Sequence, residues 1–386
     1  MRTRRRRATL ATVVAALAVA CSSGSSGSSP TSTERDDAAG ATVAQTGSTY
    51  PGGDWSHLEP AEAGFDPAAL DALAAEAEAG GSNCFLVTRH GQLVAEWYWN
   101  GTDASTVQET FSLTKSVTST LVGIAQEDGA LDVQDSAARY VPEWADTPAA
   151  EVTVENLLRN DSGRHWDLAT DYQALVAAED RTALAVGLAQ DAAPGAAWAY
   201  NNAAIQTLDA VLATATGEDP AAYAEQRLFA PLGMAHTEMS HDAAGRTTTF
   251  AGLRSTCRDL ARFGYLFLRG GRWDATQVVP EAWVEAATGR PSQELNAGYG
   301  YLWWVNHPGP IAGPLHITSE QSAAADGQMA PGAPRDMYWA RGLGGQVVQV
   351  DPGSDTVVVR LGPGDRSSTY SQTDTARVVT EALVAP

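Results

Sequence analysis

The stretch that decides the fold is FSLTKSVTSTLVG, residues 111–123, and it contains the single lysine of the chain, Lys115. Every other basic side chain among the 386 residues is an arginine. Arginine keeps its proton in proteins, whereas a desolvated lysine can become a neutral amine and act as a base. Ser112 precedes Lys115 by three residues, so both side chains fall on the same face of a helical turn. The stretch therefore brings a candidate base beside a candidate nucleophile.

The start of this predicted helix suits the attack of a hydroxyl on a carbonyl group. Free backbone N–H groups and a partial positive charge at a helix start favour a developing oxyanion. The same field, together with burial in an apolar segment, lowers the pKa of Lys115 and favours the neutral amine. Ser-x-x-Lys alone is a weak signal, because it arises about once by chance in a chain of ordinary composition. An exposed lysine in a serine-rich helix is an equally good interpretation until a second motif is found.

Residues 1–21 have the form of a secretory leader. An arginine cluster precedes an apolar run, residues 8–20, that is too short to span a bilayer. The run ends in LAVAC, which resembles the lipobox of bacterial lipoproteins with Ala18 where leucine is more usual. That resemblance implies lipidation of Cys21 and a stable membrane anchor, and the alternative is an ordinary signal peptide with an incidental cysteine. Residues 22–54, rich in Ser, Gly and Thr, are predicted to be a flexible tether. We therefore expect an extracytoplasmic protein, lipid-anchored to the cell membrane or else secreted.

Residues 55–386 are predicted to form one α/β (α+β) domain. Strand-rich segments occur near both ends of this region, and helical periodicity dominates residues 131–270. The strands are joined as hairpins rather than through βαβ crossovers, which makes their sheet antiparallel. We expect one antiparallel sheet built from residues 55–130 and 271–386, with helices on its faces and a mostly helical insertion.

Several local signals define individual elements. His-Gly at 90–91 and Asp-Pro-Gly-Ser-Asp at 351–355 predict tight turns between strands. Residues 255–259 have the form of a helix N-cap followed by an early acid, and Gly270 is expected to end that helix. Residues 306–334 are rich in Pro, Gly and Ala and are predicted to be a long surface loop.

Charge and cysteine use exclude several classes of function. A net charge of −21 argues against nucleic-acid binding, which needs a basic patch. Cys84 and Cys257 could pair in an extracytoplasmic compartment or remain two buried thiols. Neither cysteine has a metal-ligand partner at a useful spacing, and His236 and His241 lack the zincin spacing. No metal and no cofactor is expected.

A second motif gives the serine–lysine pair its meaning. The segment PGAAWAYNNAAIQTLDAVLATATG contains a Tyr-x-Asn element, Tyr200-Asn201-Asn202. Together with residues 111–144, it resembles the signatures of the serine β-lactamase, penicillin-binding protein and esterase superfamily. Further stretches resemble this family in the expected order over residues 55–386: VTVENLLRNDSG, FAPLGMAHTEM, STCRDLARFG and YGYLWWV. The likeness is greatest to the esterase and 6-aminohexanoate-dimer hydrolase branch, through STCRDLARFG, YGYLWWV and GGQVVQVDP.

The resemblance implies a role for each motif residue. Ser112 would be the acyl-accepting nucleophile and Lys115 its base. Tyr200 would relay the proton to the leaving group, and Asn202 would contact the substrate or the lysine. Taken alone, Tyr200 is more simply interpreted as a core tyrosine with a bonded hydroxyl, so its assignment depends on the first motif.

The third signature of the family is where this chain departs. Lactamases and carboxypeptidases of the family have Lys-Thr-Gly or a His variant on a strand beside the serine, and this chain has YWARGLGG at residues 338–345. We take Gly342 as the family glycine, within a register of one or two residues. The backbone N–H of Leu343 would then complete an oxyanion hole with that of Ser112. Side chains alternate along a strand, so Arg341 does not automatically replace the missing cation that would hold a substrate carboxylate.

These observations predict a cell-surface serine hydrolase that cleaves small-molecule esters or amides through an acyl-enzyme. The altered third signature lowers the expectation of penicillin hydrolysis. Two alternatives stay open. One is a penicillin-recognising D-Ala-D-Ala carboxypeptidase or β-lactamase, and the other is a non-catalytic anchored binding protein.

Overall fold

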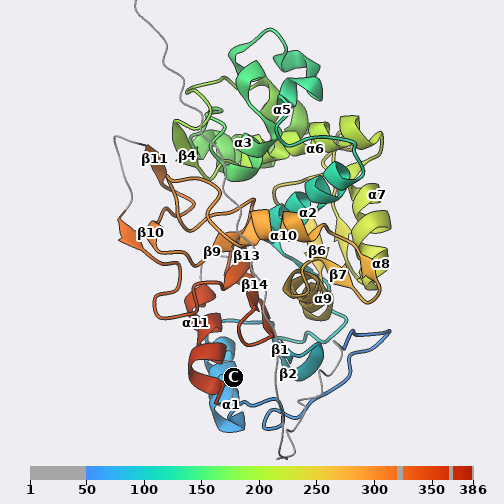
Figure 1. Cartoon of the computed structure of the whole chain (residues 1–386), viewed down its shortest axis with the longest axis vertical. Coiled ribbons are helices and arrows are strands. Elements are labelled where there is room, and N and C mark those ends of the chain that lie inside the picture. Colours follow the sequence, from blue (N-terminus) through green and yellow to red (C-terminus); the bar gives the residue numbers. More distant parts are fainter. Residues whose placement is uncertain (1–48, 320–324, 365–367, 385–386) are drawn as a thin grey trace, which may run out of the picture. The chain divides into compact units, whose positions relative to one another are not determined.

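Six strands form one antiparallel sheet in the order β2-β1-β15-β14-β13-β9 (Figure 1). The structure is a computed structural model that describes residues 49–319, 325–364 and 368–384. Both ends of the domain contribute strands to this sheet, so the predicted antiparallel sheet is confirmed. Its strands are β1 (Cys84–Arg89), β2 (Gln92–Tyr98), β9 (Trp304–Val305), β13 (Tyr338–Gly342), β14 (Gln346–Asp351) and β15 (Thr356–Leu361).

The predicted leader, Cys21 and most of the tether lie outside the described residues. Within the described ranges, none of the helices has the length and apolar character needed to cross a bilayer.

Tight turns fix the register of the two hairpins. Between β1 and β2, His90 and Gly91 have φ angles of 53° and 75°, in the left-handed region. Between β14 and β15, the Asp351 carboxylate accepts a hydrogen bond from the Ser354 N–H at 3.2 Å, and Asp355 has a φ of 58°. Both turns lie where the sequence predicts them.

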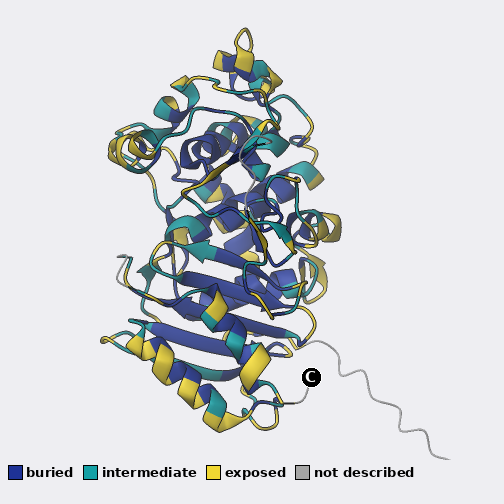
Figure 2. Cartoon of the chain, turned by 90° about the vertical axis from the view of Figure 1, so that its left-hand side faces the viewer, coloured by how far each residue is buried: buried dark blue, intermediate teal, exposed yellow. Residues whose placement is uncertain are grey.

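Helices cover both faces of the sheet, and the strands form a deeply buried layer between them (Figure 2). On one face, α1 (Pro67–Ala79) and η7 (Val378–Ala382) pack against Phe85, Val87 and Val358. The Asp66 carboxylate caps the start of α1 by accepting the Ala68 N–H at 2.9 Å.

The helix α9 (Cys257–Leu268) packs against the other face of the sheet. Its Gly264 allows a close approach, because a Cβ there would lie 2.6 Å from Val357 and 2.9 Å from Val348. A disulfide between Cys84 and Cys257 joins the first residue of α9 to β1. Of the two possibilities that the sequence leaves open for these cysteines, the structure has the paired one.

Two details of α9 correct the sequence-based expectation. Its N-cap is Thr256, whose hydroxyl accepts the Asp259 N–H at 3.1 Å, whereas Ser255 is the last residue of β6 (Leu253–Ser255). The predicted helical insertion, residues 131–270, included this helix, which instead packs on the sheet. The rest of that division into subdomains stays a prediction.

Helices are the main regular elements between residues 131 and 250, and several of them pack against α2 (Thr114–Glu127). All residues of α2 from Thr114 to Ala125 are buried. The remaining helical elements are η1 (Phe111–Leu113), η2 (Ala137–Arg139), η3 (Pro142–Trp144), η4 (Pro148–Glu151), α3 (Val154–Arg159), η5 (Thr170–Ala174), α4 (Leu175–Ala177), α5 (Arg181–Gly187), α6 (Asn202–Thr216), α7 (Pro220–Ala224), η6 (Glu225–Phe229), α8 (Ala230–Leu232), α10 (Glu281–Thr288) and α11 (Gln372–Arg377).

The described parts of the predicted surface loop, residues 306–319 and 325–334, are held by specific contacts. The buried Asn306 side chain donates to the carbonyls of Ala330 and Pro334 at 3.1 and 2.9 Å, which closes the segment on itself. This segment also contains β11 (Ile317–Ser319), which pairs with β4 (Ala197–Ala199). The other short strands are β3 (Gln108–Glu109), β5 (Glu238–Met239), β7 (Arg272–Trp273), β8 (Thr276–Gln277), β10 (Gly309–Pro310) and β12 (Asp326–Gly327).

Candidate active site

Ser112 lies on a single 3₁₀ turn, η1, immediately before α2. The helix predicted to begin in residues 111–123 is therefore present, but its first turn is tighter than an α-helix. Phe111 has a φ of 51°, a conformation that costs energy for a residue with a large side chain. Strained backbone of this kind persists where the surrounding structure enforces it, and it is common at functional sites.

Lys115 is 1% exposed, and its ammonium group has two hydrogen-bond partners. The Nζ atom donates to the Ser112 Oγ at 2.8 Å and to the Phe250 carbonyl at 2.9 Å. The predicted contact between the lysine and the serine, one helical turn apart, is thus present in the structure. Because the carbonyl can only accept, an uncharged amine could keep that bond and still receive the Ser112 proton on its lone pair.

Burial lowers the pKa of Lys115 to about 7, and the carboxylate of Asp171 opposes this shift. Asp171 lies on η5 and accepts the N–H groups of Asn202 and Ala203, at 3.0 and 2.9 Å, in the first turn of α6. Burial also raises the pKa of Asp171, and these N–H bonds limit the rise. Asp171 is therefore a buried counter-charge for Lys115, and no motif in the sequence points to it.

Tyr200 joins the same cluster from the turn between β4 and α6. Its ring stacks on Trp304, with the centroids 5.5 Å apart and the planes at 28°, and the Lys115 Nζ lies 4.7 Å from the ring centroid. The phenol is hydrogen-bonded to the side chain of Ser112, which moderates the rise in pKa that burial of Tyr200 causes. Ser112, Lys115 and Tyr200 are thus brought together from two segments that lie far apart in the sequence.

Asn202, Gly342 and Leu343 border the same cavity as Ser112. The buried Oδ1 of Asn202 has no hydrogen-bond partner among the described residues, so it is available to a ligand. A Cβ at Gly342 would lie 2.1 Å from the Thr110 carbonyl oxygen, so only glycine lets β13 pack directly against the segment that carries Ser112. Leu343, the next residue, lies at the edge of the cavity, and the assignment of Gly342 as the family glycine stays a prediction.

The cavity has a volume of about 360 Å³, and Arg341 also lines it. The guanidinium carbon lies 5.0 Å from the centroid of the Trp304 ring. Burial lowers the pKa of Arg341 to about 10, and the guanidinium has neither a hydrogen bond nor an ion pair with any residue that the structure describes. The strand of the third signature therefore does place a cation in the cavity wall, although strand alternation alone did not predict this position.

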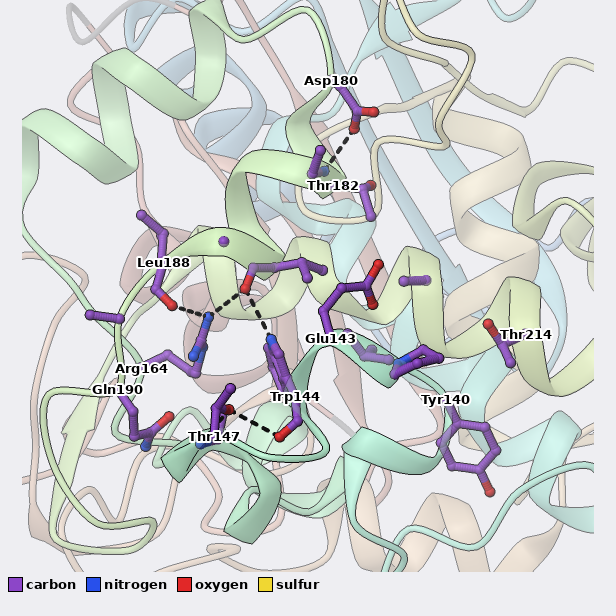
Figure 3. A pocket seen from close by; sticks show the side chains of 18 of the residues that line it. Tyr140, Glu143, Trp144, Thr147, Arg164, Asp180, Thr182, Leu188, Gln190 and Thr214 are labelled. Atoms are coloured by element: carbon purple, nitrogen blue, oxygen red, sulfur yellow. Dashed lines mark hydrogen bonds between the residues drawn. The ribbon is translucent and has the colours of Figure 1, made fainter.

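A larger cavity, of about 810 Å³, lies in the helical region (Figure 3). Its most prominent cation, Arg164, donates to the carbonyls of Ala185 and Val186 at 3.2 and 3.0 Å and stacks over Trp144. Asp180 is likewise engaged, since its carboxylate caps α5. Because Arg164 and Asp180 hold backbone in place and Ser112 lines another cavity, this cavity is not the candidate active site.

The sequence model of the beta-lactamase family matches residues 70–381. The chain belongs to the beta-lactamase family. The 6-aminohexanoate-dimer hydrolase of Paenarthrobacter ureafaciens is 24% identical over 358 residues, which cover 82% of this chain and 83% of that enzyme. As a member of this family with a hydrolase relative, the chain is a serine hydrolase, and the resemblance stated from its motifs is confirmed.

Solved structures of the family share the fold. A candidate 6-aminohexanoate-dimer hydrolase from Bacillus anthracis is 23% identical, with a TM-score of 0.63 over 80% of this chain and 82% of that chain. A penicillin-binding protein homologue from Pyrococcus abyssi, described as octameric, is 18% identical, with a TM-score of 0.60 over 82% and 77%. At these identities, the similarity to solved structures shows only that this chain shares their fold. The roles of its residues follow from the geometry of its own site.

Proposed function

We propose that this beta-lactamase family member cleaves small-molecule esters and amides through an acyl-enzyme on Ser112. The observation that carries the proposal is the 2.8 Å contact between the Ser112 Oγ and the buried Nζ of Lys115. A serine hydroxyl is a weak nucleophile until a base removes its proton, and a lysine with a pKa of about 7 can do so near neutral pH.

Each remaining residue has one step in the proposed reaction. Neutral Lys115 takes the hydroxyl proton as the Ser112 Oγ attacks the carbonyl carbon. The N–H groups of Ser112 and Leu343 stabilise the resulting oxyanion. Tyr200 passes the proton to the departing oxygen or nitrogen, which leaves the acyl group on Ser112, and water then hydrolyses this ester by the reverse sequence of proton transfers. The free Oδ1 of Asn202 would accept a hydrogen bond from the substrate.

The printed name of the Paenarthrobacter relative, a dimer hydrolase, supports including small amides among the substrates. A panel of small esters and amides tests the proposal, with Ser112→Ala as the variant. Ser119→Ala is the matched control, because Ser119 lies on the same helix with a buried hydroxyl that has no partner among the described residues. We expect Ser112→Ala to lose at least about 10³-fold in kcat/KM and Ser119→Ala to retain it. Full activity of Ser112→Ala would overturn the proposal.

Arg341 favours a second candidate function, the recognition of penicillin-like substrates that carry a carboxylate. Its guanidinium lines the Ser112 cavity, and no described residue neutralises it. Covalent labelling of Ser112 by a fluorescent penicillin, lost in Arg341→Met, would support this function. Two results would count against this second function. One is penicillin labelling that is the same in Arg341→Met as in the wild type, and the other is the absence of labelling in enzyme that hydrolyses esters.

We also propose that the enzyme works outside the cytoplasm, anchored through Cys21. The disulfide between Cys84 and Cys257 supports an oxidising compartment. Metabolic labelling with a palmitate analogue should tag the protein, and Cys21→Ala should abolish the tag. An untagged protein would favour the ordinary signal peptide.

A further inference from the structure

Exposed apolar side chains gather around the entrance of the Ser112 cavity. In the part of the chain that the structure describes, six large apolar residues are exposed, and five of them lie in segments that border this cavity. We call these five the apolar rim, and their side chains are 43–52% exposed: Leu168, Val176, Leu315, Ile317 and Leu343. The sixth, Val384, is near the C-terminus, where its N–H bonds the Gly64 carbonyl.

Three members of the rim are continuous with the wall of the cavity. Val176 and Leu343 line the cavity themselves, and Leu315 follows Pro314, which also lines it. The Tyr172 hydroxyl donates to the Pro314 carbonyl at 3.5 Å. This contact brings the segments that carry Val176 and Leu315 together across the entrance.

The other two members flank Tyr200. Ile317 lies on β11 opposite Ala199, the residue that precedes Tyr200. Leu168 lies two residues after Trp166, whose indole N–H donates to the Tyr200 carbonyl at 3.0 Å. Ile317 and Trp166 line a smaller cavity together with Asn201. Asn201 is the chain neighbour of Tyr200 and Asn202, which lie in the wall of the Ser112 cavity. The rim therefore combines residues of the cavity wall with residues beside the segment that carries Tyr200.

Such clustering needs a physical cause. Scattered exposed apolar residues are ordinary on soluble proteins, but a group beside a ligand cavity marks a binding surface. The chain has 46 acidic residues to place on its surface, yet these five positions at the entrance are apolar. A small polar substrate held entirely within about 360 Å³ would gain nothing from them.

We propose that the apolar rim binds an extended hydrocarbon chain of the substrate, so that Ser112 acts preferentially on esters or amides with a medium-length alkyl chain. The inference rests on the proposed function and specifies its substrate class. Burying a methylene group stabilises a complex by about 0.8 kcal/mol, or roughly fourfold in kcat/KM. The rim would cover only one side of a bound hydrocarbon chain, so we expect each added methylene to raise kcat/KM by about two- to fourfold. The increase should stop where the chain extends past the rim.

A series of p-nitrophenyl esters from acetate to octanoate, kept below the concentrations at which they form micelles, tests this inference. The readout is the ratio of kcat/KM for octanoate to that for acetate, in which any partial loss of folded enzyme cancels. The wild-type ratio should exceed about tenfold. In the double variant Leu168→Ser/Leu315→Ser, which changes one side chain in each of two rim segments, the ratio should fall by about fivefold or more. Val384→Ser, the matched control on an exposed apolar residue outside the rim, should keep the wild-type ratio.

The outcomes separate this inference from the proposed function. If the acetate is hydrolysed but kcat/KM does not rise along the ester series, the proposed role of the apolar rim is wrong while Ser112 catalysis stands. The same holds if kcat/KM rises equally in the double variant. If no ester is hydrolysed and a fluorophosphonate probe does not label Ser112, both the proposed function and the inference about the apolar rim are overturned. Light scattering gives a third outcome. If the wild type is a dimer, the double variant is a monomer and the octanoate-to-acetate ratio is unchanged, then the rim binds a second copy of the chain and the inference is overturned as well.

Discussion

Hydrolysis should follow the titration of Lys115 in the free enzyme, because only the uncharged amine can accept the Ser112 proton. With a pKa of about 7, the neutral fraction of Lys115 is about 90% at pH 8, about 50% at pH 7 and about 1% at pH 5. The value of kcat/KM for an uncharged ester should therefore fall by roughly 90-fold from pH 8 to pH 5. An unperturbed lysine would instead leave the enzyme nearly inactive until well above pH 9.

The Asp171→Asn variant tests the cause of this pH dependence. The Asp171 carboxylate raises the pKa of Lys115, so its removal should move the acidic limb of the profile to lower pH. Asp209→Asn is the matched control, since Asp209 is equally buried but bonds Thr182 and the Thr247 N–H instead. Asp209→Asn should leave the limb in place even if it lowers the thermal midpoint.

The assay is initial-rate hydrolysis of a neutral ester across pH 5–9, with circular dichroism at each pH to confirm that the enzyme stays folded. A profile that is flat between pH 5 and pH 8 would refute the assignment of Lys115 as the base. A limb that Asp171→Asn moves to higher pH would refute the electrostatic pairing of the two buried groups.

Three further changes have defined outcomes. Lys115→Met should lower kcat/KM by about 10³-fold or more and should also lower the thermal midpoint, because it leaves the buried Asp171 carboxylate without its cation. Gly342→Ala should cost at least about tenfold in ester turnover, since its Cβ would meet the Thr110 carbonyl and displace the turn that carries Ser112. The double variant Cys84→Ser/Cys257→Ser should lose about 2–5 kcal/mol of unfolding free energy in a guanidinium titration, because the disulfide closes a loop with a sequence separation of 173.

The parts of the fold that the sequence predicts are those fixed by local chemistry. The hairpin turns follow from residues that tolerate left-handed backbone, such as Gly91 and Asp355. The contact of Ser112 with Lys115 follows from helical spacing, which needs no knowledge of the rest of the chain. The start of α9 could be predicted only as a range, because Ser255 and Thr256 are both good capping residues and only strand pairing shows that Ser255 belongs to β6.

The parts that the sequence could not predict are set by tertiary contacts. Asp171 reaches the first turn of α6 from a separate segment, and no local pattern distinguishes it from the other acidic residues. Arg341 lies on β13, and only the folded structure shows that its side chain borders the Ser112 cavity beside the Trp304 ring. One member of the apolar rim, Ile317, is likewise placed by tertiary structure, because the pairing of β11 with β4 sets it opposite Ala199, the residue before Tyr200.

The acyl-enzyme itself gives the most direct test of the central claim, that a neutral Lys115 activates Ser112. The enzyme is mixed with a slowly hydrolysed ester at pH 8, quenched in acid within the first turnover and measured by intact mass, followed by peptide mapping. We predict a mass increase of one acyl group, located on Ser112 and absent from Lys115→Met. Turnover without any covalent adduct, or an acyl group on another residue, would contradict the claim.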